Sequence, residues 1–232
     1  MTRFLKVVLV SIFACLLIGC KSNEQKAEAL IKEYMFKNLY DFDSYEAVET
    51  IIDSAYYSPK LNQQVMSLAL DAVEKYKASK EHEKKLEDAR REMSIWNGGW
   101  SSSSRREYDK ARKTALKELI KCEEAERDWA EDILQISELI KTLPEDFVGW
   151  NVNHRFRCNT RGGNKSLGDY LFVMDEKIKT IIQVFDLDDN DFKDAMTNIG
   201  AAQSSEVELL RDVPAKLNEQ IEGLNEALRK IE

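Results

Sequence analysis

The stretch Ile95–Ser104, IWNGGWSSSS, separates two long segments that share one apolar pattern. Over Val65–Trp96 before it and Tyr108–Leu143 after it, seam residues recur at alternating steps of three and four. This is the spacing of helices that pack along a narrow seam. Glycines interrupt helices and serines cap them, so the sequence predicts an antiparallel helical hairpin over residues 61–143.

The position of the turn sets the register of this hairpin. If the turn is centred on Trp100 and Ser101, seam residues at equal distances in sequence from this centre face each other across the hairpin. Leu86 then faces Ala115. Lys75 then faces Glu126. We call the polar middle of the seam the waist; it comprises Lys75, Ser79 and His82 against Leu119, Cys122 and Glu126. Polar seam residues fix register at a cost in stability, so we interpret the waist as structural.

The pattern changes to a period of two after Pro144. The segment 147–159, FVGWNVNHRFRCN, alternates apolar and polar residues as a half-buried strand does. Two further strand-like runs follow, so residues 144–188 are predicted to form a three-stranded antiparallel meander. Its apolar face needs a cover, which the helices can supply.

The two ends of the mature chain are predicted to be helical. Residues 20–60 comprise a lipid anchor, a tether and a first helix near 24–39, followed by a run that fits either a helix or a strand. Residues 189–232 carry another narrow seam, in which Pro214 predicts a break or kink. We expect this segment to pack on the hairpin. The predicted fold class is therefore α+β, mainly α, with a helical hairpin, a C-terminal helix and a small β-meander.

The N-terminus reads MTRFLKVVLVSIFACLLIGC, with basic Arg3 and Lys6 before a short apolar run. This organisation is typical of a signal peptide, here residues 1–19. Its end resembles a bacterial lipobox, in which a cysteine receives lipid; the matching residues are Leu17, Ile18, Gly19 and Cys20. We therefore expect a covalent lipid on Cys20 that anchors the protein to a membrane. We expect no other cofactor. An ordinary secretory signal or an uncleaved anchor is the alternative.

The composition fits an envelope protein. The 232 residues include 34 Lys and Arg and 42 Asp and Glu, a net charge of −8 that argues against nucleic acid as a partner. Cys15 leaves with the signal peptide, so Cys122 and Cys158 remain, and we favour free thiols over one disulfide. Lys21 is not the aspartate that retains enterobacterial lipoproteins at the inner membrane. The outer membrane is therefore favoured, and whether the chain faces the periplasm or the cell surface stays open.

Three segments resemble a known family: LYDFDSYEAVET at 39–50, IWNGGWSSSSRREYDKA at 95–111 and FVGWNVNHRFRCNTRGG at 147–163. They are similar to segments of small, uncharacterised cell-envelope lipoproteins of Bacteroidetes. The resemblance covers most of the mature chain. It implies a location in the cell envelope and transfers no active-site residue.

Two pairs of residues invite a catalytic or metal-binding interpretation. His154 and Cys158 share one face of a predicted strand, but four strand residues span about 13 Å, too far for direct proton transfer. His82 and Cys122 lie near each other in the waist, where a metal would need further ligands. We therefore expect no catalytic residue at either place.

The acidic run DLDDNDFKD, residues 186–194, begins like a calcium-binding loop. Asp191 stands where the sharp turn of such a loop requires glycine, and Thr197 stands where it requires a bidentate glutamate. We interpret the run as an acidic turn that caps a helix, and we expect no metal site.

Two features predict contacts with other molecules. Arg155, Arg157 and Arg161 form a small basic patch, either a solvated strand face or a site for an anionic ligand or acidic partner. Trp100 lies at the hairpin turn, where contact with a partner, a glycan or a membrane surface competes with burial against Trp96. Burial of Trp100 is slightly favoured.

These observations favour a non-enzymatic envelope lipoprotein that offers its bundle or sheet to another envelope protein or a glycan. The alternative is a lipoprotein inhibitor or immunity-like factor against a secreted toxin or enzyme. A hydrolase is less well supported, because the chain has two histidines and no recognisable nucleophile constellation. We expect a monomer or a weak homodimer.

Overall fold

The computed structural model describes residues 22–231, which form two compact units, each built from two separate segments of the chain. The helix–sheet unit contains residues up to Tyr56 together with Phe147–Leu187, and the helical unit contains Tyr57–Asp146 together with the chain from Asp188. The fold is α+β and mainly α, as the sequence predicts. The lipobox and the signal peptide lie outside the described residues.

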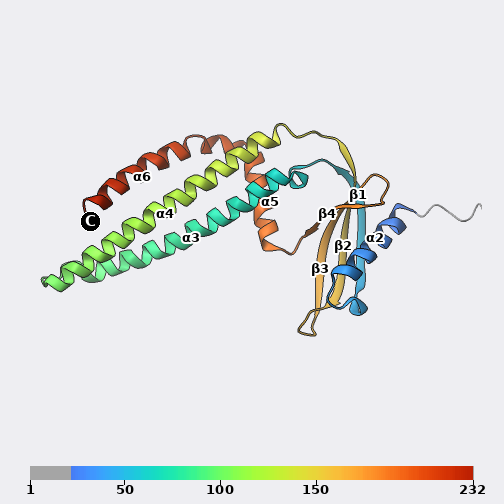
Figure 1. Cartoon of the computed structure of the whole chain (residues 1–232), viewed down its shortest axis with the longest axis horizontal. Helices are drawn as coiled ribbons and strands as arrows, with labels where there is room; N and C mark the ends of the chain where they lie inside the picture. The colour runs from blue at the N-terminus through green and yellow to red at the C-terminus, as the bar shows by residue number, and fades with distance from the viewer. Residues whose placement is uncertain (1–21, 232) are drawn as a thin grey trace, which may run out of the picture. The chain divides into compact units, whose positions relative to one another are not determined.

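In the helix–sheet unit, the described residues form a four-stranded antiparallel sheet in the order β1-β2-β3-β4 (Figure 1). Its elements are α2 (Asn23–Asn38), a 3₁₀ turn η1 (Phe42–Ser44), β1 (Glu46–Tyr56), β2 (Phe147–Asn159), β3 (Lys165–Met174) and β4 (Ile181–Asp186). Ser22 caps α2, because its hydroxyl accepts a hydrogen bond from the Gln25 amide while the Gln25 side chain accepts from the Ser22 amide.

The sheet has one strand more than the predicted meander. Residues 46–56, which fit a helix or a strand by sequence, form β1 and pair with β2, so that Thr50 lies opposite His154 and Ile52 opposite Val152. A strand at this place supplies hydrogen-bond partners to the otherwise open edge of β2. The sheet therefore extends beyond residues 144–188 and includes part of the segment 20–60.

The helix α2 covers one face of this sheet. The core beneath it consists of Ala27, Ile31 and Met35 from α2, Val152 and Phe156 from β2, Phe172 and Met174 from β3, and Ile178. Three of these side chains stand four residues apart on α2, which places them on one side of the helix. The helix is thereby fixed against the sheet at the place where a cavity opens.

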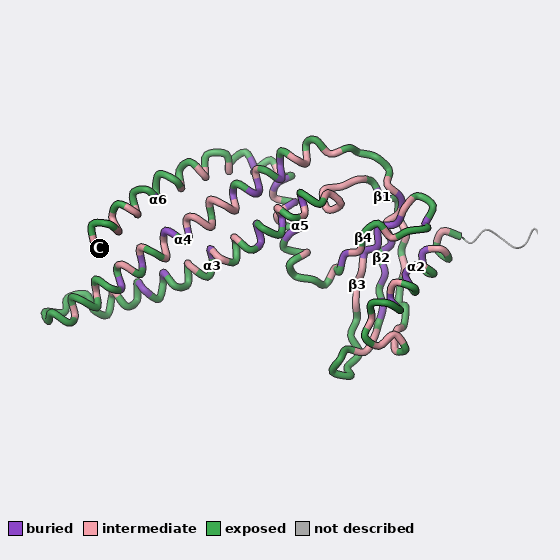
Figure 2. The backbone as a smooth tube through the Cα atoms, in the orientation of Figure 1, coloured by how far each residue is buried: buried purple, intermediate pink, exposed green. Residues whose placement is uncertain are grey.

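The helical unit contains the predicted hairpin and two further helices (Figure 1). Its elements are η2 (Pro59–Leu61), α3 (Gln63–Trp96), α4 (Ser102–Ile140), α5 (Asn190–Gln203), η3 (Ser205–Leu210) and α6 (Val213–Arg229). The side chains of Asn62 and Ser101 cap α3 and α4. Figure 2 shows buried residues recurring at intervals along both long helices, as seam packing requires.

The C-terminal segment contains two helices, where the sequence predicts one helical segment with a break or kink at Pro214. The 3₁₀ segment η3 separates α5 from α6, and the predicted break lies just before Pro214, which stands in the first turn of α6. Proline is tolerated there because the first helical amides have no partner within the helix. Both helices pack on the hairpin, α5 on α3 and α4, and α6 on α4.

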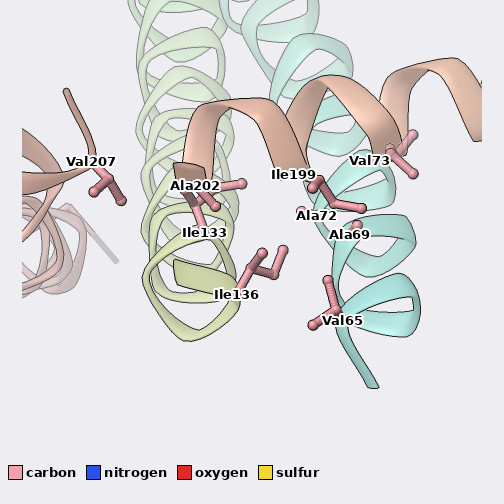
Figure 3. Close-up of a cluster of buried hydrophobic side chains, with 10 residues drawn as sticks. Val65, Ala69, Ala72, Val73, Ile133, Ile136, Ile199, Ala202 and Val207 are labelled. Atoms are coloured by element: carbon pink, nitrogen blue, oxygen red, sulfur yellow. The ribbon is translucent and has the colours of Figure 1, made fainter. Parts of the chain in front are cut away.

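A single cluster joins α5 and η3 to the hairpin (Figure 3). Its buried residues are Val65, Ala69, Ala72, Val73, Ile133, Ile136, Ala195, Ile199, Ala202 and Val207. Small residues on α3 let larger ones from α4 and α5 approach closely. None of the helices within residues 22–231 is both long and apolar enough to cross a bilayer.

The hairpin register agrees with the prediction at two places, and one ion pair differs. Leu86 and Ala115 belong to one buried cluster, and Ser79 Oγ lies 3.5 Å from Cys122 Sγ. Lys75, however, contacts Asp132 at 2.5 Å rather than Glu126. Asp132 is 7% exposed and needs a countercharge, whereas Glu126 is exposed to water.

Candidate functional site

A cavity of about 520 Å³ opens in the helix–sheet unit between α2, η1 and β1. It is lined by Glu28, Lys32, Phe42, Asp43, Tyr45, Ala47, Thr50 and His154. Glu28 and Lys32 are four residues apart on α2, so they stand on the same side of that helix. The cavity thus combines exposed charges of both signs with aromatic rings and one buried histidine.

His154 is the innermost of these residues, with 2% of its surface exposed. Its Nε2 lies 2.7 Å from Tyr45 Oη and its Nδ1 lies 2.9 Å from Thr50 Oγ1. Burial lowers the pKa of His154 below its usual range, although the charge of Asp169 acts in the opposite direction. The ring is therefore neutral at neutral pH, with one nitrogen donating a hydrogen bond and the other accepting one.

Aromatic rings connect this histidine to the surface. Phe36, which is 67% exposed, contacts the edge of Phe42 at a centroid distance of 5.3 Å. Phe42 stacks on Tyr45 at 5.5 Å, and Tyr45 lies 6.0 Å from His154. Rings packed in this way have few alternative rotamers, so the wall of the cavity is preorganised.

Titratable groups around the cavity stay uncharged where they are buried. Burial raises the pKa of Tyr45, and the negative charge of Glu28 raises it further. Burial likewise raises the pKa of the Cys158 thiol, to which Asp41 adds. Cys158 is therefore protonated at neutral pH, and a protonated thiol is a poor nucleophile. What the cavity offers a ligand is ring faces, hydrogen bonds and charges at its rim.

Sequence reasoning does not single out Tyr45 or Thr50, because it leaves the run that follows the first helix open between a helix and a strand. The alternation of Val48, Thr50 and Ile52 is the signal that could have placed Thr50 on the same strand face as the core. His154 was placed on the inward face of β2, and the structure confirms this position. It bonds to Tyr45 and Thr50 rather than to Cys158.

The arginines of the predicted basic patch have partners close by. Arg155 lies 3.3 Å from Asp169 and 3.8 Å from Glu49, so carboxylates balance its charge. The guanidinium of Arg161 stands 5.5 Å from the centroid of the Tyr40 ring. Arg157, exposed on β2, contributes to lowering the pKa of Glu46, although Lys165 has the larger effect.

Trp100 is fully exposed, whereas Trp96 is 39% exposed. The expectation that Trp100 folds back on Trp96 is therefore wrong. Between the two tryptophans α3 ends, and Gly98 takes a φ of +86°, a left-handed conformation that glycine adopts without strain. Contact between Trp100 and another molecule stays a prediction.

The waist is held by hydrogen bonds within the hairpin. Ser79 donates to Glu126 at 3.2 Å, and His82 Nδ1 lies 2.7 Å from Glu118. Burial raises the pKa of Cys122. Both Cys122 and Cys158 are free thiols, as expected.

The acidic run at 186–194 caps a helix, as the sequence predicts. Asp189 precedes α5 and its side chain accepts a hydrogen bond of 2.8 Å from the Asp191 amide. Over residues 22–231, no three side chains among His, Cys, Asp and Glu gather closely enough to hold a metal ion.

The cavity around His154 is the site that the geometry favours. Comparisons of the chain with protein-family models, with curated proteins and with solved structures find no match, so the assignment of this site rests on its own geometry.

Proposed function

We propose that the chain is a bacterial outer-membrane lipoprotein whose helix–sheet unit binds an envelope glycan without transforming it. The proposed anchor is lipid on Cys20, supported by the signal sequence and by the lipobox residues Leu17, Ile18 and Gly19. The proposed binding site is the cavity around His154. The resemblance to envelope lipoproteins of Bacteroidetes supports the same location.

The observation that carries the glycan assignment is the lining of the cavity. Stacked rings such as Phe42 and Tyr45 suit the C–H faces of sugars, and carboxylates such as Asp43 accept hydrogen bonds from hydroxyl groups. Ligand cavities typically enclose about 300–1,000 Å³, a range that includes this one. Charges of both signs at the rim suit an amino sugar that carries a peptide, as in the bacterial cell wall.

The anchor can be tested by metabolic labelling. Cells that express the wild-type chain should incorporate labelled palmitate into it, whereas Cys20→Ser should abolish incorporation, because the thiol is the atom that takes the lipid. Cys15→Ser is the matched control, since Cys15 lies within the predicted signal peptide, and should label like the wild type. Labelling that persists in Cys20→Ser would refute the lipoprotein assignment.

The glycan site can be tested by filling the cavity. Ala47 lines it from β1, so Ala47→Trp should place a ring where the sugar would stack and weaken binding about tenfold or more. Saturation-transfer NMR with disaccharide-peptide fragments of peptidoglycan and with the oligosaccharide of lipopolysaccharide measures this on the full-length chain. Val48→Trp, at the exposed neighbouring position, is the control. Binding equal in both variants, or no binding of either glycan by the wild type, would contradict the assignment.

A further inference from the structure

The end of the helical hairpin exposes large apolar side chains to solvent. We define the hairpin tip as residues 90–106, which include the end of α3, the turn and the beginning of α4. Trp100 is fully exposed, Ile95 is 73% exposed and Trp96 is 39% exposed. Indole rings combine an apolar body with a polar N–H group, so they suit a boundary between water and an apolar phase.

The same tip is positively charged on an acidic protein. Residues 90–106 contain four arginines and one glutamate, a charge of +3, whereas the whole chain carries −8. The arginines are Arg90, Arg91, Arg105 and Arg106, all exposed. Arg91 lies within 3.6 Å of Glu87 and Asp88, and exposed contacts of this kind are weak enough to exchange for another anion.

The turn holds Trp100 in a defined place. Gly98 takes a positive φ of +86°, and Gly99 packs so closely on Ser104 that a Cβ atom would lie 2.3 Å from the Cβ of that serine. Ser101 then accepts a hydrogen bond of 3.1 Å from the Ser104 amide and begins α4. Trp100 is thus presented between a fixed turn and a capped helix, which lowers the entropy lost on binding.

We propose that the hairpin tip binds an anionic lipid surface, with Trp100 and Trp96 at the headgroup level and the arginines against lipid phosphates. Tryptophan is enriched at membrane interfaces, and basic residues are attracted to anionic headgroups. A stable protein partner or a second copy would need about 800 Å² from each side. Two helix ends and a short turn present a narrow, convex surface of mixed apolar and cationic character, which fits a lipid surface better. This inference does not depend on the proposed glycan site.

Depth-dependent fluorescence quenching tests the proposal. The full-length chain is reconstituted into vesicles of phosphatidylglycerol mixed with phosphatidylcholine, or of phosphatidylcholine alone, each containing lipids brominated in the acyl chain. Because the chain has four tryptophans, the emission of Trp100 is taken as the difference between the wild type and Trp100→Phe. Flotation of the vesicles first establishes that the protein is attached to them.

The proposal expects strong quenching of Trp100 in anionic vesicles, little quenching in neutral ones, and loss of quenching at high salt. In Arg105→Gln/Arg106→Gln, the affinity of the tip for anionic vesicles should fall roughly fivefold for each arginine removed. Lys84→Gln/Lys216→Gln removes the same charge outside the tip and should leave quenching unchanged.

Three outcomes would overturn it. The first is an unquenched Trp100 in anionic vesicles, or a chain that fails to float with them. The second is equal quenching in both kinds of vesicle that the arginine variant does not change. The third is protection of Trp100 from solvent that increases with protein concentration in the absence of lipid. This result would show that the hairpin tip binds a second copy of the chain.

Discussion

His154→Ala should lower the free energy of unfolding of the helix–sheet unit by about 3–5 kcal/mol, the range observed when a buried ring is truncated to alanine. His154 is 2% exposed, and its ring contacts those of Tyr45, Phe156 and Phe172. Its removal also leaves two part-buried hydroxyl groups, on Tyr45 and Thr50, without a hydrogen-bond partner.

The other histidine of the chain provides the matched control. His82 lies on α3, is half-buried, and makes one close contact, with Glu118. His82→Ala should cost only about 1 kcal/mol, because Glu118 keeps a second cationic partner in Lys121, 3.3 Å away. Two units need not unfold together, so protection of β2 and α3 amides against hydrogen exchange in denaturant should be measured separately. Equal losses in the two variants would show that His154 is not part of the core.

The same residue predicts how stability depends on pH. Because burial lowers the pKa of His154 in the folded chain, the unfolded chain takes up a proton first on acidification. The stability of the helix–sheet unit should therefore fall as the pH drops below about 6.5, the usual pKa of histidine, and should be insensitive to this group above that value. His154→Gln should remove this slope, and an unchanged slope would assign it to another group.

The sequence is sufficient to predict the elements whose patterns are long. The seam residues of Val65–Trp96 and Tyr108–Leu143 repeat often enough to define two helices, their antiparallel pairing and their register. The period-two run at 147–159 defines β2 in the same way. Long periodic segments average out the weak preferences of individual residues, so their structure is predicted correctly.

Short or ambiguous segments depend on contacts that sequence does not reveal. Residues 46–56 fit two periodicities, and what decides between them is the open edge of β2, about ninety residues later in the chain. The split between α5 and α6 similarly depends on packing against the hairpin. Sequence reasoning does not predict the cavity around His154 for the same reason. Tyr45 and Thr50 reach His154 only when β1 pairs with β2.

Lys75 shows a different limit of sequence reasoning. Seam symmetry places Lys75 opposite Glu126, but a lysine side chain is long enough to reach further along the facing helix. The carboxylate it contacts is that of Asp132, which is buried, whereas Glu126 retains access to water. Desolvation therefore selects the partner, and it cannot be evaluated before the packing is known.

The pairing of Lys75 with the buried carboxylate of Asp132 carries the second large prediction. Lys75→Met should lower the free energy of unfolding of the helical unit by about 3–5 kcal/mol, because it leaves the carboxylate of Asp132 buried without a countercharge. Burial already raises the pKa of Asp132 even beside Lys75, and the charges of Asp71 and Asp128 act in the same direction. Thermal unfolding followed by circular dichroism should show the loss as a melting temperature about 10 °C lower.

A neighbouring lysine on the same helix provides the control. Lys77 contacts Asp191 of α5 at 2.6 Å, nearly the distance of the Lys75 pair, but the side chains of Lys77 and Asp191 are both about half exposed. Lys77→Met should therefore cost much less stability than Lys75→Met, because an exposed pair is screened by water. Acidification should partly rescue Lys75→Met, because a carboxylate with a raised pKa takes up a proton more readily in the folded chain than in the unfolded one. A loss in Lys75→Met no larger than that in Lys77→Met would show that Asp132 is adequately solvated.

The double variant Lys75→Met/Asp132→Leu separates stability from specificity. Replacing both charges with apolar groups removes the desolvation cost, so its stability should return to within about 1 kcal/mol of the wild type or exceed it. If the charged pair also fixes the register, α3 and α4 of this stable variant should adopt more than one register against each other. Cysteines introduced at Leu86 and Ala115 should crosslink under mild oxidation in the wild-type background, with little crosslinking from position 86 to Leu119→Cys. In the double variant, position 86 should crosslink both to position 115 and to position 119. If it still crosslinks mainly to position 115, the apolar layers of the seam are sufficient to fix the register without the charged pair.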